Sequence, residues 1–195
     1  MKSTREPTLK HLIDDLNSIN NMKNNRFTIL AMQLYAEHYV NQIVLESIGE
    51  PAKTEVKNHL SFPQKLRILE NMKVLDKSTK RVLETLNTIR DSFVHELILT
   101  PEDIAKKLQA MNLGFSYQWK VDDKQTYSVD LEKVFLEKVK DKYNQLVISS
   151  IVVIGILYNQ LKVIQKQKLD QFVFVDFVKN KDKWAAILSV REIHS

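Results

Sequence analysis

Apolar residues recur every three or four positions over most of the chain, which is the spacing of helices that bury one face. Residues 8–20 show this spacing and predict a short helix. A long helix is predicted over residues 27–48, because the pattern continues until Gly49 and Pro51, both of which stop helices.

Start signals mark three further helices in the first part of the chain. Ser61 is followed by a proline two residues later, so it is predicted to be an N-cap. Asp76 or Ser78 is expected to cap the next helix, and a Thr-Pro-Glu-Asp sequence at Thr100 begins another. Residues 27–112 therefore predict four helices with short links, which is a compact bundle.

The pattern changes in the second part of the chain. Residues 115–121 alternate between apolar and polar side chains like a strand, and residues 122–125 predict a turn into a second strand. A long helix is expected over about residues 129–169. The sequence FVFVDFV, residues 172–178, is β-branched and aromatic and favours a strand, with a helix packed on several sides as the alternative.

These patterns predict a mainly α fold with a small β element. Residues 1–113 are expected to form an antiparallel helical bundle with its core at residues 27–100. Residues 114–195 are expected to form a C-terminal elaboration that contains a long helix and packs on the bundle. Glycine and proline number only three and four, and chains poor in both usually form long helices joined by short turns.

Composition narrows the functional classes. The chain has no cysteine, which excludes disulfides and thiol chemistry and fits a reducing compartment or an indifferent one. The first 12 residues lack the apolar run of a signal peptide. Leu146–Tyr158 is the most apolar run, but a membrane span needs about 20 residues. We expect that run to be a buried helix and the protein to be cytoplasmic, without a membrane partner. The net charge of +5 is spread thinly, so charge alone only slightly favours nucleic acid.

One cation lies where the helical pattern requires an apolar residue. On a helical wheel at about 100° per residue, Arg90 falls between Leu83 and Leu97 inside an apolar arc. A buried guanidinium without a partner is strongly unfavourable. Arg90 is therefore expected to meet a carboxylate, a ligand or water in a cleft. His95 lies about 140° away on a straight helix, so the two converge only if the helix bends or a second subunit completes the site.

An acid shows the complementary anomaly on the helix predicted over residues 27–48. Glu37 lies near the centre of its apolar stripe, and Asn41 lies beside it four residues later. We hypothesise that Glu37 and Arg90 approach each other across the helix interface, with Asn41 close by. The alternative function of such a contact is purely structural, as a buried ion pair that fixes the helix register.

The sequence LNTIRDSFVHEL, residues 86–97, resembles the R-x-x-x-x-H motif of HEPN domains, often seen as iRN-x-faH. Residues 60–76 are similar to the lsf-x-x-K helix that leads into that motif, and residues 35–48 to the first core helix of the family. The resemblance covers residues 27–100. It implies a small helical bundle that often dimerises around the motif, with Arg90 and His95 at the motif positions.

The resemblance implies that the protein binds RNA. Many HEPN domains are metal-independent ribonucleases of toxin, abortive-infection and antiviral systems, and others are non-catalytic regulators, including mannitol-repressor-like proteins. Asp91 stands where the family often has asparagine, and it adds a negative charge where phosphate would approach. Leu97 stands where the antitoxin-modified branch has tyrosine, so no nucleotidyltransferase partner is inferred.

Metal-free cleavage uses the RNA 2′-hydroxyl as the nucleophile, so the expected roles follow from side-chain chemistry. His95 would transfer protons, because the reference pKa of histidine is about 6.5. Arg90 would bind the phosphate. Glu37, Asn41 and Asp91 would position Arg90 and His95. No metal or cofactor is expected, because the histidines lack ligand spacing.

Three functions follow from these residues. The first is a HEPN ribonuclease acting as a homodimer. The second is a HEPN-like bundle without catalysis that binds RNA, nucleotide or a protein such as an antitoxin. The third is an unrelated helical interaction protein in which Arg90 forms a structural ion pair.

Overall fold

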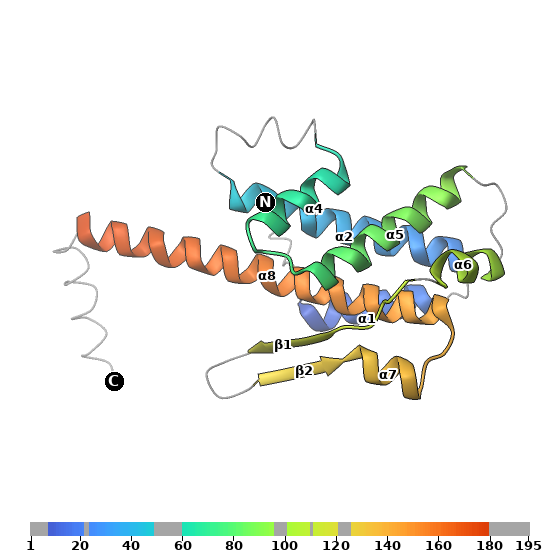
Figure 1. Cartoon of the computed structure of the whole chain (residues 1–195). Coiled ribbons are helices and arrows are strands. Elements are labelled where there is room, and N and C mark those ends of the chain that lie inside the picture. Colours follow the sequence, from blue (N-terminus) through green and yellow to red (C-terminus); the bar gives the residue numbers. More distant parts are fainter. Residues whose placement is uncertain are drawn as a thin grey trace.

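A computed structural model describes six stretches of the chain, and the structural statements below concern these: residues 8–21, 24–48, 60–95, 101–109, 111–120 and 126–179. The fold is mainly α with one small two-stranded sheet, as predicted (Figure 1). The helices before the sheet are α1 (Leu9–Asn21), α2 (Asn25–Ser47), α4 (Phe62–Asn71), α5 (Lys77–His95) and α6 (Pro101–Leu108).

Two of the three predicted helix starts are confirmed by their hydrogen bonds, and the third, at Thr100, lies outside the described residues. Ser61 precedes α4, and its backbone N–H donates to Oε1 of Gln64 at 2.7 Å. Asp76 is the cap of α5, because its carboxylate accepts from the backbone N–H groups of Ser78 and Thr79 at 2.8 and 2.9 Å. These bonds satisfy first-turn donors that have no partner within the helix.

The predicted hairpin is present as β1 (Ser116–Lys120) and β2 (Thr126–Asp130), which pair antiparallel. The prediction of a single helix over residues 129–169 is wrong. The structure has two helices in this part of the chain, α7 (Leu131–Glu137) and α8 (Lys142–Lys179).

Two aspartates explain why the helix divides. The carboxylate of Asp130 accepts from the backbone of Lys133 at 3.0 Å and starts α7, and that of Asp141 accepts from Asn144 at 2.8 Å and starts α8. The strand favoured over residues 172–178 is also wrong, since α8 continues through them. No glycine or proline interrupts the helix there, so its continuation overrides β propensity.

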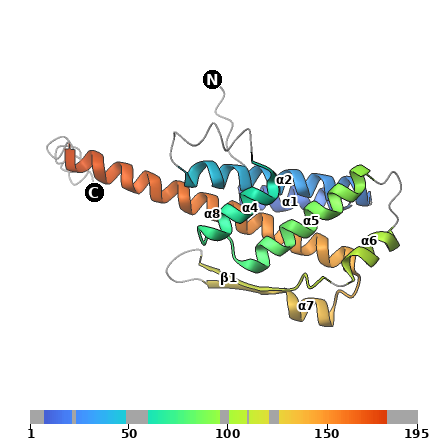
Figure 2. The ribbon, with the colours of Figure 1, turned by 45° about the horizontal axis from the view of Figure 1, so that its top comes forward.

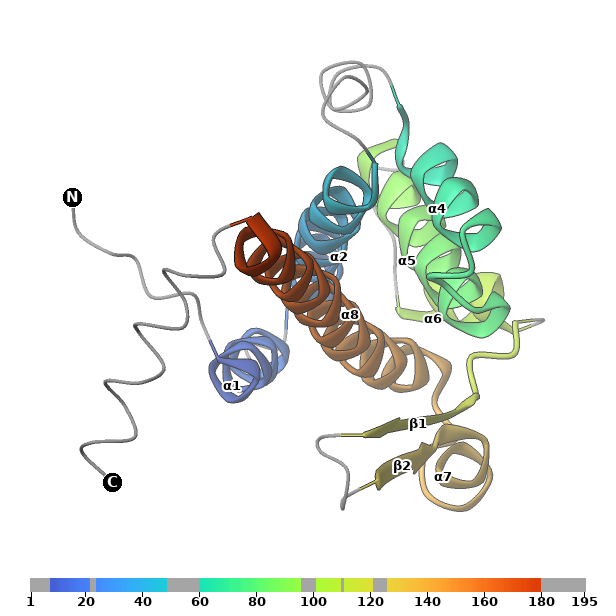
Figure 3. The same ribbon diagram turned by 90° about the vertical axis from the view of Figure 1, so that its left-hand side faces the viewer.

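Helix α8 is the central element. Figure 3, which looks along the bundle, shows it among α1, α2, α5 and the sheet, and its C-terminal part extends past α2 and α5 (Figure 2). It packs against α1, α2, α5 and α6. Eight of its buried side chains lie in the same hydrophobic cluster as the buried residues of α2 and α5: Tyr143, Leu146, Val147, Val153, Ile154, Ile156, Leu157 and Leu161.

Eight of the 13 residues in the apolar run Leu146–Tyr158 are buried in the protein, as expected for this run. Among the described residues, one helical stretch, Lys142–Gln167, has the length and composition to cross a membrane, and 44% of its most apolar part is buried. The division of the chain at residues 113 and 114 stays a prediction, although α8 shares its core with the preceding helices.

The apolar stripe that the sequence predicts on α2 is only partly the buried face. Val40 and Val44 of that stripe are 0% exposed, but Phe27 and Leu34 are 46% and 68% exposed. The core also receives four residues outside the stripe that are each 0% exposed: Ile29, Met32, Ala36 and Ile43. The reason is that apolar residues occur all around α2, which contacts α1, α4, α5 and α8, so its own sequence does not determine which side is covered.

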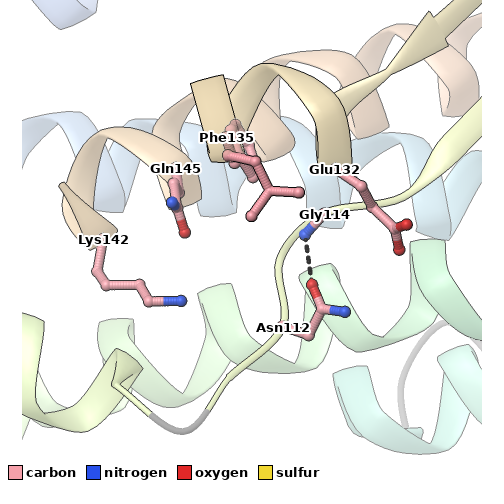
Figure 4. Close-up of a pocket in the computed structure, with 7 residues that line it drawn as sticks. Asn112, Gly114, Glu132, Phe135, Lys142 and Gln145 are labelled. Carbon is pink, nitrogen blue, oxygen red and sulfur yellow. Dashed lines mark hydrogen bonds between the residues drawn. The ribbon is translucent and has the colours of Figure 1, made fainter. Parts of the chain in front are cut away.

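Gly114 allows the chain before β1 to pass close to α7. A Cβ atom at this position would lie 2.8 Å from Cγ and 3.0 Å from Cα of Glu132. A pocket of about 290 Å³ opens beside this contact (Figure 4). Two of the polar side chains that line it form hydrogen bonds with nearby backbone groups. Lys142 donates to the carbonyl of Met111 at 3.1 Å, and Oδ1 of Asn112 accepts from the Gly114 N–H at 2.9 Å.

Replacing Gly114 with alanine is expected to destabilise the protein by about 1–3 kcal/mol, the usual cost of overpacking. The backbone of Glu132 cannot yield as its side chain can, so α7 must shift. Urea denaturation of the two proteins measures the difference. Ser128→Ala is the control, because Ser128 is exposed on the adjoining strand, and stability of Gly114→Ala equal to that of the control would contradict the prediction.

Candidate functional site

Arg90 lies at the edge of the buried face of α5, not in its centre. Four residues of α5 near Arg90 in the sequence are buried: Leu83, Thr85, Ile89 and Phe93. Helix α5 packs against both α2 and α8, so its buried face is wider than a single apolar arc. The side chain of Arg90 is 31% exposed, so part of it faces solvent.

Three side chains of α5 form a closed polar network around that guanidinium. Arg90 Nη1 lies 2.9 Å from Oδ1 of Asp91. Arg90 Nη2 donates to Oδ1 of Asn87 at 3.3 Å, and Nδ2 of Asn87 donates to Oδ2 of Asp91 at 3.0 Å. The carboxylate of Asp91 therefore forms an ion pair with Arg90, and Asn87 forms a hydrogen bond with each of these two charged groups. The network orients Arg90 along the edge of α5.

Helix α2 contributes one buried amide to the network. Nε2 of Gln33 donates to Oδ1 of Asn87 at 3.3 Å, and the Gln33 residue is only 2% exposed. Two donors thus meet the carbonyl oxygen of Asn87, so its amide nitrogen is directed at Asp91. Oε1 of Gln33 is buried without a hydrogen-bond partner among the described residues.

The predicted ion pair between Glu37 and Arg90 is not formed in the part of the chain that the structure describes. The helices α2 and α5 run antiparallel, because Arg26 contacts the carbonyl of Phe93 and Gln33 contacts Asn87. This register places Glu37 and Arg90 on opposite sides of the Gln33–Asn87 level, about 10 Å apart along the helix axes.

Asn41 and His95 have different positions relative to the network. Oδ1 of Asn41 is buried and has no hydrogen-bond partner among the described atoms, so this oxygen accepts no hydrogen bond from Arg90. His95 is the last residue of α5, and its side chain lies outside the described residues. Its backbone is about 7.5 Å further along the helix than that of Arg90.

Two cations from other helices also contact the C-terminal turns of α5. Arg26 of α2 donates to the carbonyl oxygen of Phe93 at 3.1 Å, and Lys107 of α6 donates to Oγ of Ser92 at 2.8 Å. On a helical wheel Ser92 lies about 160° from Arg90, so Lys107 and Arg90 lie on nearly opposite sides of α5.

Sequence reasoning missed Gln33, Asn87 and Arg26. A signal was present for Asn87, because it precedes Arg90 by three residues and Asp91 by four, the two spacings that bring helical side chains together. Gln33 and Arg26 carried no comparable signal, since their roles depend on the register between α2 and α5. That register is a property of the packed bundle.

Comparisons with models of protein families, with curated proteins and with solved structures found no significant match. The resemblance to HEPN domains thus rests on the sequence motifs described above.

Proposed function

We propose that the protein is a HEPN-like RNA-binding protein that cleaves RNA without a metal ion. The observation that carries the proposal is the partly exposed side chain of Arg90, whose guanidinium contacts Asn87 and Asp91 on the same helix as His95. By the same resemblance we propose a cytoplasmic role in a defence or toxin system, with an antitoxin as a further protein partner.

The proposed chemistry assigns one task to each side chain. Arg90 stays charged and offers a planar set of donors to phosphate oxygens, so it stabilises the charge that develops during cleavage. His95 takes a proton from the 2′-hydroxyl or gives one to the leaving oxygen. Asn87 and Asp91 are positioning residues, because they contact Arg90 and not the reacting atoms.

The test of this function is cleavage of single-stranded RNA in the presence of EDTA. The wild-type protein is expected to produce fragments that end in a 2′,3′-cyclic phosphate, because the attacking group is the neighbouring hydroxyl. Arg90→Ala is expected to lose this activity. Intact RNA after prolonged incubation with the wild-type protein, or cleavage that occurs only when a divalent metal is added, would exclude the proposed reaction.

A second candidate function is a non-catalytic HEPN-like bundle that binds RNA or a protein, and one observation favours it. The 2.9 Å contact with Asp91 already neutralises Arg90, so a phosphate must displace or share that carboxylate. The pair lies within one helix, so it does not fix the register between helices as a Glu37–Arg90 pair would have. RNA binding without cleavage is the outcome that distinguishes this function.

Asp91→Asn is expected to strengthen RNA binding about tenfold at low salt. Asparagine keeps the shape of the side chain and its contact with Asn87, but it no longer neutralises Arg90. The loss of a half-exposed ion pair costs at most about 1 kcal/mol of stability. Fluorescence anisotropy with labelled RNA measures the affinity.

The matched control for this substitution is Asp15→Asn, which makes the same charge change at an exposed position of α1. A gain caused only by higher net charge would appear in both variants. Equal affinities of Asp91→Asn and Asp15→Asn would show that Asp91 does not restrain Arg90.

We further propose that two copies associate through the exposed apolar side of α2. Phe27 and Leu34 are 46% and 68% exposed, and they flank the residues of α2 that contact α5. Exposed apolar patches of this kind mark interaction surfaces. A two-fold axis there would bring the two copies of Arg90 and His95 toward each other, as in HEPN dimers.

Leu34→Asp is expected to convert the dimer to a monomer, because a charge in an apolar interface has no partner. The mass in solution, measured by light scattering after size-exclusion chromatography, reports the change. Leu136→Asp is the control, since Leu136 is 80% exposed on α7. A wild-type protein that is monomeric, or a Leu34→Asp variant that remains dimeric, would rule out this interface.

A further inference from the structure

The pocket beside Gly114 lies between α7, the first turn of α8 and the segment that precedes β1 (Figure 4). We call this cavity of about 290 Å³ the α7–α8 pocket. Its described lining residues are Asn112 and Gly114 before β1, Glu132, Phe135 and Leu136 of α7, and Lys142 and Gln145 of α8. None of these residues belongs to α2 or α5, so the pocket is separate from the Arg90 network.

One positive and one negative side chain line the α7–α8 pocket. Glu132 is exposed, and its side chain forms no ion pair or hydrogen bond within the described part of the chain. The ammonium of Lys142 donates to the carbonyl of Met111 at 3.1 Å and has two further donors. No other titratable side chain is among the described residues that line the pocket. A ligand that carries both charges therefore matches the pocket better than a simple anion or cation.

Gln145 provides an acceptor that the described chain leaves unused. The residue is only 7% exposed, and its Nε2 donates to the carbonyl of Val139 at 2.7 Å. That bond fixes the amide, and Oε1 at its other end accepts no hydrogen bond from the described residues. This oxygen points into the pocket in Figure 4, and it is not fully buried, as Oε1 of Gln33 is. Gln145 follows Lys142 by three positions, so the acceptor and the cation lie on the same side of α8.

Apolar side chains of α7 form another wall of the α7–α8 pocket. Phe135 is 6% exposed, whereas its neighbour Leu136 is 80% exposed, the highest value among the large apolar side chains that the structure describes. Covering Leu136 with an apolar group removes hydrocarbon surface from water, which is favourable. The pocket thus combines two opposite charges, an unused acceptor and an apolar surface.

We propose that the α7–α8 pocket binds a free α-amino acid with an apolar side chain. The carboxylate of the ligand contacts Lys142, its ammonium donates to Oε1 of Gln145, and its side chain covers Leu136. The negative charge of Glu132 favours the ammonium of the ligand. The volume is close to the lower end of the range for small-molecule sites, about 300–1,000 Å³, which suits a ligand of this size. This inference does not depend on RNA binding or cleavage by Arg90 and His95.

The first test is isothermal titration calorimetry of the full chain with leucine, N-acetylleucine and leucinamide. Leucine is expected to saturate one site. N-acetylleucine lacks the ammonium and leucinamide lacks the carboxylate, so each is expected to bind about tenfold more weakly or less. Equal affinities for the three compounds would overturn the proposal, because the pocket would then not recognise the two charges.

The second test uses variants of the two charged residues. Lys142→Ala is expected to weaken leucine binding about tenfold or more, and Glu132→Gln about two- to fivefold, since Glu132 is exposed. The matched controls are Lys166→Ala on α8 and Glu137→Gln on α7, which change exposed residues outside the pocket. Lys142→Ala also removes the bond to Met111, so circular dichroism checks its folding. Glu132→Gln removes no described contact and tests the pocket even if Lys142→Ala does not fold.

The two tests together decide the proposal. Weaker leucine binding by the pocket variants, with wild-type affinity in both controls, supports the site. Absence of saturable leucine binding by the wild-type protein, or equal affinities of the pocket variants and their controls, would overturn it.

Discussion

His95→Ala is expected to lower the rate of EDTA-resistant RNA cleavage by about 10²–10⁴-fold, the usual contribution of a positioned proton-transfer group. The affinity for RNA should change little, because in the proposed reaction Arg90 supplies the phosphate contact. A drop in rate constant at unchanged affinity separates a proton-transfer role from a binding role. Single-turnover kinetics with labelled RNA measures both quantities.

The histidine controls make this prediction specific. His11→Ala removes an exposed histidine of α1, whose Nδ1 lies 2.8 Å from Oγ1 of Thr8, and it should leave cleavage unchanged. The activity of His95→Ala should also not recover at any pH, since alanine cannot titrate. Cleavage by His95→Ala at the wild-type rate would remove His95 from the mechanism while leaving RNA binding by Arg90 open to its own test.

Leu157→Ala is expected to destabilise the whole protein by about 2–5 kcal/mol. Leu157 is 0% exposed and lies at the centre of α8, in the same cluster as the buried residues of α2 and α5. Removing its side chain leaves a cavity that the surrounding helices only partly fill. Urea denaturation followed by circular dichroism gives the difference in the free energy of unfolding.

The same experiment tests the predicted division of the chain. Because α8 shares its core with α2 and α5, one cooperative transition is expected, shifted to lower urea in Leu157→Ala. Leu136→Ala is the matched control, because Leu136 is 80% exposed. Two separate transitions, with only one shifted by Leu157→Ala, would show that residues 114–195 unfold as their own unit.

Local signals in the sequence predicted much of the fold. The caps at Ser61 and Asp76 and the alternation in residues 115–121 depend on neighbouring residues in the chain, and the corresponding elements are present. The sequence was less informative where two local preferences conflict. Residues 172–178 have strand propensity but continue a helix without a break, and the helix prevailed.

The site was predicted only in part, because its contacts depend on how helices pack. Arg90 was identified as a misplaced cation, and Asp91 is its partner in the same helix. Glu37 was the wrong partner, since α2 is apolar on several sides and its orientation follows from its neighbours. Gln33 enters the site through the antiparallel register of α2 and α5, which helical wheels of single helices do not contain.

The most direct test of the proposed RNA contact is the salt dependence of RNA binding by the wild-type protein and by Arg90→Ala. If Arg90 contacts one phosphate, the variant should bind more weakly, and the slope of the logarithm of the binding constant against the logarithm of salt concentration should become shallower by about 0.7 for single-stranded RNA. Identical affinities and slopes for the two proteins would contradict it, because Arg90 would then have no part in binding RNA.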